Sequence, residues 1–362
     1  MRRLLAGSML AATLPLSLGA QGLQETAVIA SPQMAQYTFT AGALKQTVSQ
    51  FSIPLVVLLP FSERFNVDIA TAFATSDFKQ GGTSSSKISG LTDTQIRANF
   101  SLGSDLLVFT VGMNIPSGQY LIPVEQVAAA GQIGNDFLGY PISSMGNGLA
   151  GTGGIAFARA LGTWNLGAGG SFRKSAEFDF FQRDSVGPYR FEPADEIRMR
   201  FSLDRPVGDG EFSLGVSYSA FGEDFADTTT YSTGDRITLT GGWSFPVRSA
   251  TMFISGWNLF RLEGKQVGGD APKENVSSLN LGVSFNAGDV LIQPNIEARL
   301  WQVATVRAGQ LVNIGTRVRF SAGAFSLYPA VAYSIGKTYV PETGAAQYDV
   351  TGFRGGLTIR YH

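Results

Sequence analysis

The chain contains no cysteine, and its only histidine is the last of its 362 residues, His362. The first absence excludes disulfides, zinc–thiolate sites, iron–sulfur clusters and a cysteine nucleophile. The second removes the residue type that most often serves as general base, metal ligand or triad member. We therefore expect no enzyme, with no catalytic residues, no metal site and no cofactor.

Charge and long apolar runs are scarce as well. Only 15% of the residues are Asp, Glu, Lys or Arg, and the formal net charge is -1. Nucleic-acid binding calls for a basic excess, so we expect no nucleic-acid partner. No uninterrupted apolar run of about 18 residues follows the first twenty, which argues against a helical membrane protein. The abundant residues are 44 Gly and 26 Phe, typical of many turns and a wide aromatic surface.

The first residues resemble an export signal. Two arginines precede the apolar stretch 4–18, and the small residues Gly19 and Ala20 follow it. A membrane anchor is the alternative, but the stretch is shorter than the roughly 20 apolar residues that span a bilayer. We expect residues 1–20 to be a signal peptide.

Apolar side chains recur at every second position along most of the remaining chain. Examples are Phe51 to Leu59, Ile96 to Leu102, Leu107 to Ile115, Ile197 to Leu203, Phe212 to Tyr218 and Ile237 to Phe245. Successive side chains of a strand point to opposite faces, so this period predicts strands with one apolar face.

The connections alternate between short and long. The short ones are 60–64, 102–105, 161–163, 206–211, 287–289 and 321–323; the long polar ones are 79–90, 116–150, 174–195, 222–235, 263–277 and 337–348. In an antiparallel meander this rhythm gathers the short turns at one end and the long loops at the other, as in outer-membrane barrels with periplasmic turns. A soluble sandwich or propeller also gives alternating strands. The export signal, the rhythm and the aromatic content favour an all-β, antiparallel, up-and-down transmembrane β-barrel in the bacterial outer membrane.

The strand number follows from counting back from the chain end. About fifteen strands lead back to Leu59, and a barrel with both ends in the periplasm needs an even number. A short first strand in QYTFTAG, residues 36–42, gives about sixteen. Fourteen remains open if one weak pair is loop. We expect residues 21–34 to be an N-terminal arm or plug and residues 35–362 to be the barrel.

The last strand predicts the two sides of the wall. Leu357, Ile359 and Tyr361 share one face and should contact lipid, whereas Thr358 and Arg360 should face the lumen. The placement of Gly356, Ile359 and Tyr361 resembles an outer-membrane assembly signal, so the expected partners are outer-membrane lipid and the barrel assembly machinery. Candidates for interfacial aromatic girdles are Trp164, Phe245, Phe285, Phe325 and Tyr361 near the turns, and Trp257 and Tyr333 toward the loops.

Charged side chains gather on the predicted lumen face. The candidates are Arg97, Glu196, Arg198, Arg200, Glu297, Arg299, Arg317 and Arg319. Arginines outnumber carboxylates there, which favours either selection of anionic solutes or bracing of the barrel by pairs across neighbouring strands. Glu196 and Glu297 could also form a glycosidase pair, but the sequence does not fix their separation.

The longest connection, 116–150, contains a helix signal. Pro123 stands at a plausible first helical position and predicts a short helix near Val124 to Ala130. A loop of this length either folds into the pore as a constriction or lid or extends outward. Both alternatives remain open at this stage.

Residues 88–119 resemble the outer-membrane proteins of the phenol meta-degradation family, distantly related to the long-chain fatty-acid transporters. The resemblance rests on Gly90 and Asp93 opening one strand, the turn at Gly103, and Pro116-Ser117-Gly118 closing the next. It implies a barrel that passes small hydrophobic or aromatic compounds, and it assigns no binding residues.

The expected function is a passive outer-membrane channel or transporter for small, hydrophobic, aromatic or anionic molecules. The alternatives are a general polar porin and a structural barrel that transports nothing. The sequence does not identify the solute or the oligomeric state.

Overall fold

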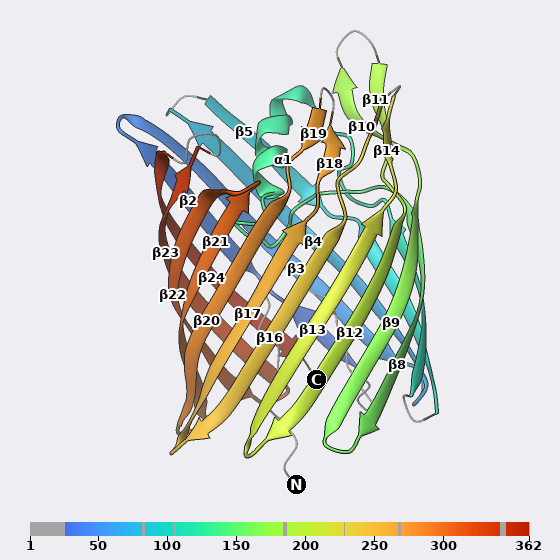
Figure 1. Cartoon of the computed structure of the whole chain (residues 1–362), viewed down its shortest axis with the longest axis vertical. Coiled ribbons are helices and arrows are strands. Elements are labelled where there is room, and N and C mark those ends of the chain that lie inside the picture. Colours follow the sequence, from blue (N-terminus) through green and yellow to red (C-terminus); the bar gives the residue numbers. More distant parts are fainter. Residues whose placement is uncertain are drawn as a thin grey trace.

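The chain forms a closed antiparallel β-barrel with one short helix (Figure 1). The computed structural model describes residues 26–81, 84–103, 106–183, 187–227, 229–266, 269–340 and 345–361. Within this part the wall has sixteen strand positions, which confirms the predicted fold class and strand number. The expected signal peptide, residues 1–20, lies outside the described residues.

Two of the wall positions are each built from two consecutive strands. β1 (Ala27–Ala30) and β2 (Gln33–Ala41) form the first position, and β5 (Ser84–Leu91) and β6 (Thr94–Leu102) form the fourth. The single-strand positions are β3 (Leu44–Pro60), β4 (Phe65–Gln80), β7 (Leu107–Ile115), β8 (Ala150–Leu161), β9 (Trp164–Ser175), β12 (Glu196–Val207), β13 (Gly210–Phe221), β16 (Arg236–Val247), β17 (Ala250–Arg261), β20 (Glu274–Ala287), β21 (Val290–Val303), β22 (Val306–Ala322), β23 (Phe325–Tyr339) and β24 (Ala346–Tyr361).

The last strand closes the ring against the first. β24 is antiparallel to β1, with Val28 opposite Tyr361, and to β2, with Tyr37 opposite Gly352. The backbone groups of β24 are therefore paired on both sides, as a sheet in hydrocarbon requires. This closure also explains why part of the predicted arm differs from expectation. Residues 27–30 and 33–34 of the stretch 21–34 lie in the wall, where they supply the partner that β24 needs.

The two ends of the barrel differ in their connections. At one end, here called the turn end, the strands are joined at 61–64, Gly103, 162–163, 208–209, 248–249, 288–289 and 323–324. The other end, here called the loop end, carries three short hairpins: β10 (Phe178–Arg183) with β11 (Gly187–Glu192), β14 (Asp224–Ala226) with β15 (Thr229–Tyr231), and β18 (Gly264–Gln266) with β19 (Gly269–Ala271). Figure 1 shows β10 and β11 projecting at the upper, loop end.

Two predicted loops are wrong in length, and the rhythm of connections is less strict than expected. Within 79–90, β4 continues to Gln80 and β5 begins at Ser84, and within 337–348 only residues 340–345 separate β23 from β24. The turns at 42–43 and 304–305 are also short although they lie at the loop end. In these places polar strands continue past the apolar band, because backbone pairing does not require apolar side chains.

The outer face of the wall is apolar. On β12, Ile197, Met199 and Phe201 point outward and are 53%, 53% and 46% exposed. Leu357, Ile359 and Tyr361 share the outward face of β24, and Tyr361 contacts Phe325 across the strand pair at 5.3 Å between ring centroids. This pattern extends over eleven residues of β12, from Ile197 to Val207 with Arg205 as its one charged outward residue, and over nine residues of β24, from Phe353 to Tyr361. Both lengths match the roughly 9–11 residues of a transmembrane strand. No helix among the described residues is long and apolar enough to cross a bilayer.

One predicted girdle residue is wrong. Trp257 points inward, opposite in phase to the outward Met252 and Ile254 of the same strand. Its ring lies 5.5 Å from the guanidinium of Arg299 and packs against a buried cluster inside the barrel. The inner face of β17 is apolar at this point because a loop covers it, so alternation alone does not distinguish its two sides.

Candidate functional site

The connection between β7 and β8, residues 116–149, folds into the barrel and is here called the inner loop. It contains the 3-10 helix η1 (Val124–Gln126) and the helix α1 (Val127–Ile133), which confirms the predicted short helix. The Phe137 ring stacks on Trp301 of β21, with centroids 5.5 Å apart and planes at 25°. From β7 to β21 the ring runs through β8, β9, β12, β13, β16, β17 and β20, eight steps of sixteen. The inner loop therefore crosses the lumen to the opposite wall.

Three side chains of that opposite wall hold the inner loop by its backbone carbonyls. Arg299 donates from Nη1 to the Phe137 carbonyl at 2.8 Å, and the Tyr37 hydroxyl donates to the Leu138 carbonyl at 3.1 Å. Arg354 donates to the same Leu138 carbonyl. Hydrogen bonds from charged donors are the stronger ones in a protein interior, so this contact fixes the far end of the loop.

Glu297 orients the arginine that makes this contact. Its carboxylate lies 2.7 Å from Nη2 of Arg299 and also accepts hydrogen bonds from Ser278 and Asn313. Arg299 is only 3% exposed, and its charge is balanced by this neighbour. A buried guanidinium without such a partner would be costly.

β3 supplies a second set of attachments. Gln50 is 1% exposed and forms two hydrogen bonds with Ile142: its Nε2 donates to the carbonyl at 2.7 Å, and its Oε1 accepts from the amide at 2.9 Å. The Tyr140 hydroxyl donates to the Val48 carbonyl at 3.0 Å. Burial raises the pKa of Tyr140, and the neighbouring Tyr37 adds to this shift, so the hydroxyl keeps its proton and remains a donor.

Asp93 ties the two ends of the inner loop together. This carboxylate, 7% exposed, stands where β5 gives way to β6. It accepts from the Gly118 amide at 3.1 Å, the Asn147 amide at 2.6 Å and the Asn114 side chain at 2.8 Å. A Cβ on Gly118 would lie 2.2 Å from the Met145 carbonyl oxygen, so the two ends pack too closely for any side chain there.

An apolar cluster completes the attachment of the inner loop. Its buried members from the loop are Ala129, Ile133, Phe137, Leu138, Tyr140 and Met145, and those from the wall are Ala35, Tyr37, Val48, Ala74, Ile88, Val276, Leu311 and Val350. Gly309 lets the Phe137 ring approach, since a Cβ there would lie 2.7 Å from a ring carbon. Such dense packing makes the loop a fixed part of the lumen rather than a loose connection.

The inner loop covers only one side of the lumen. Inward residues of β2, β3, β4, β22 and β24, here called the covered half, are almost fully buried: Tyr37 0%, Val48 1%, Ala74 0%, Leu311 1% and Val350 0%. The strands β8, β9 and β12 are here called the open half. Their inward residues Ala156, Ala158, Arg200 and Ser202 are exposed, whereas Ala150 and Glu196, nearer the loop end, are 3% and 7% exposed. All of these point into the same enclosed space, so the difference marks open space in front of the turn-end part of the open half.

A group of arginines lines the open half. Arg173 of β9 stands opposite Glu196 of β12, which pairs with Arg198 at 2.6 Å. Arg200 is exposed to the lumen. Three guanidinium groups thus share this wall with Glu196, and a fourth, that of Arg97, faces the lumen from β6, opposite Asp68 of β4.

The remaining predicted lumen residues lie apart from this group. All eight candidates are on the inner face by strand phase. Arg317 and Arg319 are on β22, where the Arg319 guanidinium lies 5.8 Å from the Tyr328 ring centroid. Glu196 and Glu297 stand on β12 and β21, five strands apart in the ring, and each is held by an arginine.

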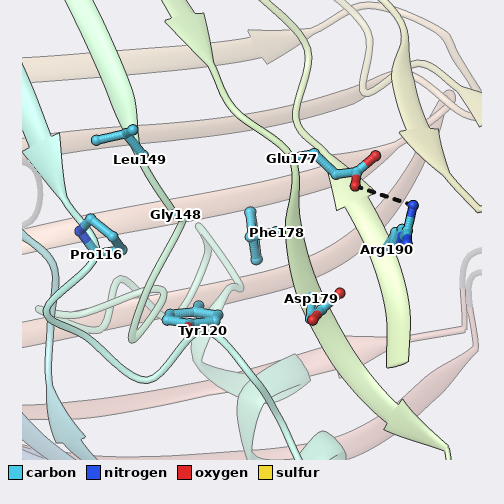
Figure 2. Close-up of a pocket in the computed structure, with 8 residues that line it drawn as sticks. All are labelled: Pro116, Tyr120, Gly148, Leu149, Glu177, Phe178, Asp179 and Arg190. Atoms are coloured by element: carbon cyan, nitrogen blue, oxygen red, sulfur yellow. Dashed lines mark ion pairs between the residues drawn. The ribbon is translucent and has the colours of Figure 1, made fainter. Parts of the chain in front are cut away.

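A pocket of about 490 Å³ opens at the loop end beside the β10–β11 hairpin (Figure 2). Pro116, Tyr120, Gly148 and Leu149 line it from the inner loop, and Glu177, Phe178, Asp179 and Arg190 line it from the hairpin region. Glu177 and Arg190 form an ion pair at 3.8 Å. Aromatic contacts continue from Tyr120 through Phe178 and Phe191 to Tyr231, with centroids 5.7–6.0 Å apart. Burial raises the pKa of Tyr231 to about 12, so its hydroxyl keeps its proton at neutral pH.

The sequence did not reveal several residues that shape the lumen. Gln50 and Asp93 act through partners 92 and 54 positions away, such as Ile142 and Asn147. The sequence offered one signal for Gln50: it is in phase with Val48, on the face of β3 opposite the apolar Phe51. This phase indicated an inward side chain but not its partner. No group of three or more His, Cys, Asp or Glu in the described part of the chain is arranged to hold a metal ion.

The apolar outer face, the polar inner face and the closed ring together define a transmembrane β-barrel with an internal loop. No protein-family model matches the chain, and no curated protein matches it. Among solved structures, OprB of Pseudomonas putida has 10% identity, 93% coverage of both chains and a TM-score of 0.44. An outer membrane channel from Pseudomonas putida has 14% identity, covers 96% of this chain and 99% of its own, and has a TM-score of 0.42. OmpT of Vibrio cholerae, folded in vitro, has 10% identity, 96% and 100% coverage and a TM-score of 0.41. Similarities this distant assign neither a family nor a solute.

Proposed function

We propose that this barrel is a passive outer-membrane channel for small organic anions, including aromatic carboxylates, with its turn end in the periplasm. The contrast between the covered and the open half of the lumen carries the proposal, because it leaves a passage beside a firmly held constriction. The proposed channel performs no catalysis and needs no cofactor. It depends on outer-membrane lipid and on the barrel assembly machinery for insertion.

The arginines of the open half favour anions. Rings and rows of charged side chains select solutes by the sign of their charge. Arg200 is exposed in the passage, and Arg97 faces the same lumen from β6. The exposed small side chains of β8, such as Ala156 and Ala158, leave room in front of them. A flat aromatic acid would pass with its carboxylate near Arg200 and its ring along this wall.

The other interpretation of the lumen charges is that they brace the barrel by pairing with one another, and this fits a different set of the charged residues. Glu297, Arg299 and Arg354 hold the inner loop, and Arg198 is paired with Glu196. We assign selection to Arg97 and Arg200, and bracing to these paired residues.

Ion selectivity tests the proposal directly. The purified barrel in planar bilayers under a KCl gradient should give a reversal potential that shows chloride preference. Arg200→Gln should lower the chloride-to-potassium permeability ratio by about two- to fivefold, since one charge near an ion in an aqueous pore is worth about 1 kcal/mol. Arg205→Gln is the matched control, because it removes an arginine from the outer face of the same strand.

Solute flux distinguishes the proposal from its alternatives. Proteoliposomes should swell in benzoate and much less in a neutral sugar of similar size. Equal swelling in both would indicate a general polar porin. A complete lack of conductance in correctly folded protein would indicate a structural barrel and contradict the proposal.

A further inference from the structure

Two arginines on the outer face of the barrel stand out against an otherwise apolar surface. Arg159 is in phase with the outward Phe157 and Leu161 of β8, and Arg205 is in phase with the outward Phe201 and Val207 of β12. Among the described strand residues, no other charged side chain lies on the outer face of the turn-end half. An arginine in contact with lipid costs roughly 2–4 kcal/mol at the bilayer midplane and about 0–1 kcal/mol near the interface.

The two arginines lie at the same depth. Each stands two residues before the end of its strand, Arg159 before Leu161 and Arg205 before Val207. This places both at the level of the headgroups on the turn-end side. Their strands flank β9 on either side, so the two backbones are about 10 Å apart, twice the spacing of neighbouring strands. Long arginine side chains can reach one phosphate group from there.

An indole stands between them. Trp164 is the first residue of β9, and the Arg205 guanidinium lies 4.8 Å from its ring centroid. Neither Arg159 nor Arg205 forms an ion pair with a carboxylate of the described residues, and both side chains are exposed. Two uncompensated cations beside an interfacial tryptophan are complementary in charge and depth to a lipid phosphate.

We propose that Arg159, Arg205 and Trp164 form a binding site for the headgroup of an anionic phospholipid in the leaflet at the turn end. The guanidinium groups bind the phosphate, and the indole packs beside the glycerol region. The site lies on the outer surface, so it does not depend on the proposed channel function.

Tryptophan quenching by brominated lipids tests this site in the intact barrel. Of the four tryptophans, Trp257 and Trp301 point inward and Trp243 and Trp164 outward. In the Trp243→Phe background, Trp164 is the one indole that contacts lipid. Its quenching in vesicles of mixed composition gives the association constant of brominated phosphatidylglycerol relative to brominated phosphatidylcholine. We expect a ratio of about five or more, since each arginine near an anionic headgroup contributes about fivefold, and the ratio should fall with added salt.

The control places an indole on the opposite side of the barrel. Phe325 is the first residue of β23, just as Trp164 is the first residue of β9, and the two strands lie eight positions apart in the ring. Among the described strand residues, no outward charged side chain flanks Phe325. The variant Phe325→Trp, combined with Trp164→Phe and Trp243→Phe, should give a ratio near one.

Substitution of the arginines completes the test. The double variant Arg159→Gln and Arg205→Gln should reduce the ratio at Trp164 to about that of the control, whereas the corresponding double lysine variant should keep most of it. These changes make the outer face less polar, so the barrel should still fold, which heat-dependent migration on gels verifies. An equal ratio at both indole positions, or a ratio at Trp164 that survives the glutamine substitutions, would overturn the proposal.

Discussion

Removal of the Asp93 carboxylate should release the ends of the inner loop while leaving the barrel wall intact. Asp93→Ala leaves the Gly118 amide, the Asn147 amide and the Asn114 side chain without their shared acceptor. The wall itself is held by backbone pairing of β6 with β4 and β7, which the substitution does not touch.

The expected magnitude follows from the hydrogen bonds that are lost. A hydrogen bond to a charged group contributes about 1.5–3 kcal/mol, so the loss of two at the loop ends removes about 3–6 kcal/mol from local stability, less any coupling between them. The far end remains attached through Arg299 and Gln50. We therefore expect amide exchange in residues 116–149 to accelerate by about 100-fold or more, because roughly 1.4 kcal/mol corresponds to a factor of ten. Single-channel recordings should show greater open-channel noise and a higher mean conductance.

A matched variant controls for the loss of a loop carboxylate as such. Asp195 accepts from the Ser175 amide at 3.4 Å and pairs with Lys174 at 3.2 Å, at the stem of a different loop. Asp195→Ala should leave exchange in the inner loop and the conductance unchanged. Asp93→Asn, which keeps one acceptor oxygen, should give an intermediate rate. Wild-type exchange and wild-type conductance in folded Asp93→Ala would refute the role of Asp93 as the anchor.

Further substitutions test the packing of the inner loop and the end of the chain. Gly309→Val should force the Phe137 ring away from β22 and lower the local stability by about 1–3 kcal/mol, which faster amide exchange around Phe137 would show. Gly151→Val is the control, because open space surrounds Gly151, and it should have little effect. Tyr361→Ala removes the ring contact with Phe325 and should lower stability by about 0.5–1.5 kcal/mol. If the end of the chain is an assembly signal, Tyr361→Ala should also slow insertion by the assembly machinery in reconstituted membranes, and an unchanged insertion rate would contradict that role.

The sequence predicted the wall well where lipid lies on one side and water on the other. Leu357, Ile359 and Tyr361 alternate with polar or charged residues, and a period of two leaves only one assignment of faces. Prediction failed at Trp257, where the inner face is apolar because the inner loop covers it. The prediction of a loop at residues 79–90 failed for a related reason. Here polar parts of β4 and β5 extend beyond the apolar band, and their composition is that of a loop.

The candidate site could be predicted only in part. The residues on the lumen side followed from strand phase, but their partners did not. Arg354 contacts Leu138 across 216 positions, and Gln50 contacts Ile142 across 92. Such contacts depend on how a 34-residue loop from 116 to 149 folds inside the closed ring, which local patterns do not determine. For this reason two arginines of similar sequence context, Arg299 and Arg200, have different surroundings: one holds the loop and the other is exposed.

Cysteine accessibility in a conducting channel tests the division of the lumen most directly, since the natural chain has no cysteine to interfere. Ala156 and Ala74 both point inward, but Ala156 is exposed in the open half and Ala74 is 0% exposed beneath the inner loop. A charged thiol reagent added during single-channel recording should react with Ala156→Cys and reduce the current, while Ala74→Cys should show no change. Equal reaction at both positions, or reaction at position 74 alone, would contradict a loop that closes one half of the lumen and leaves the other open.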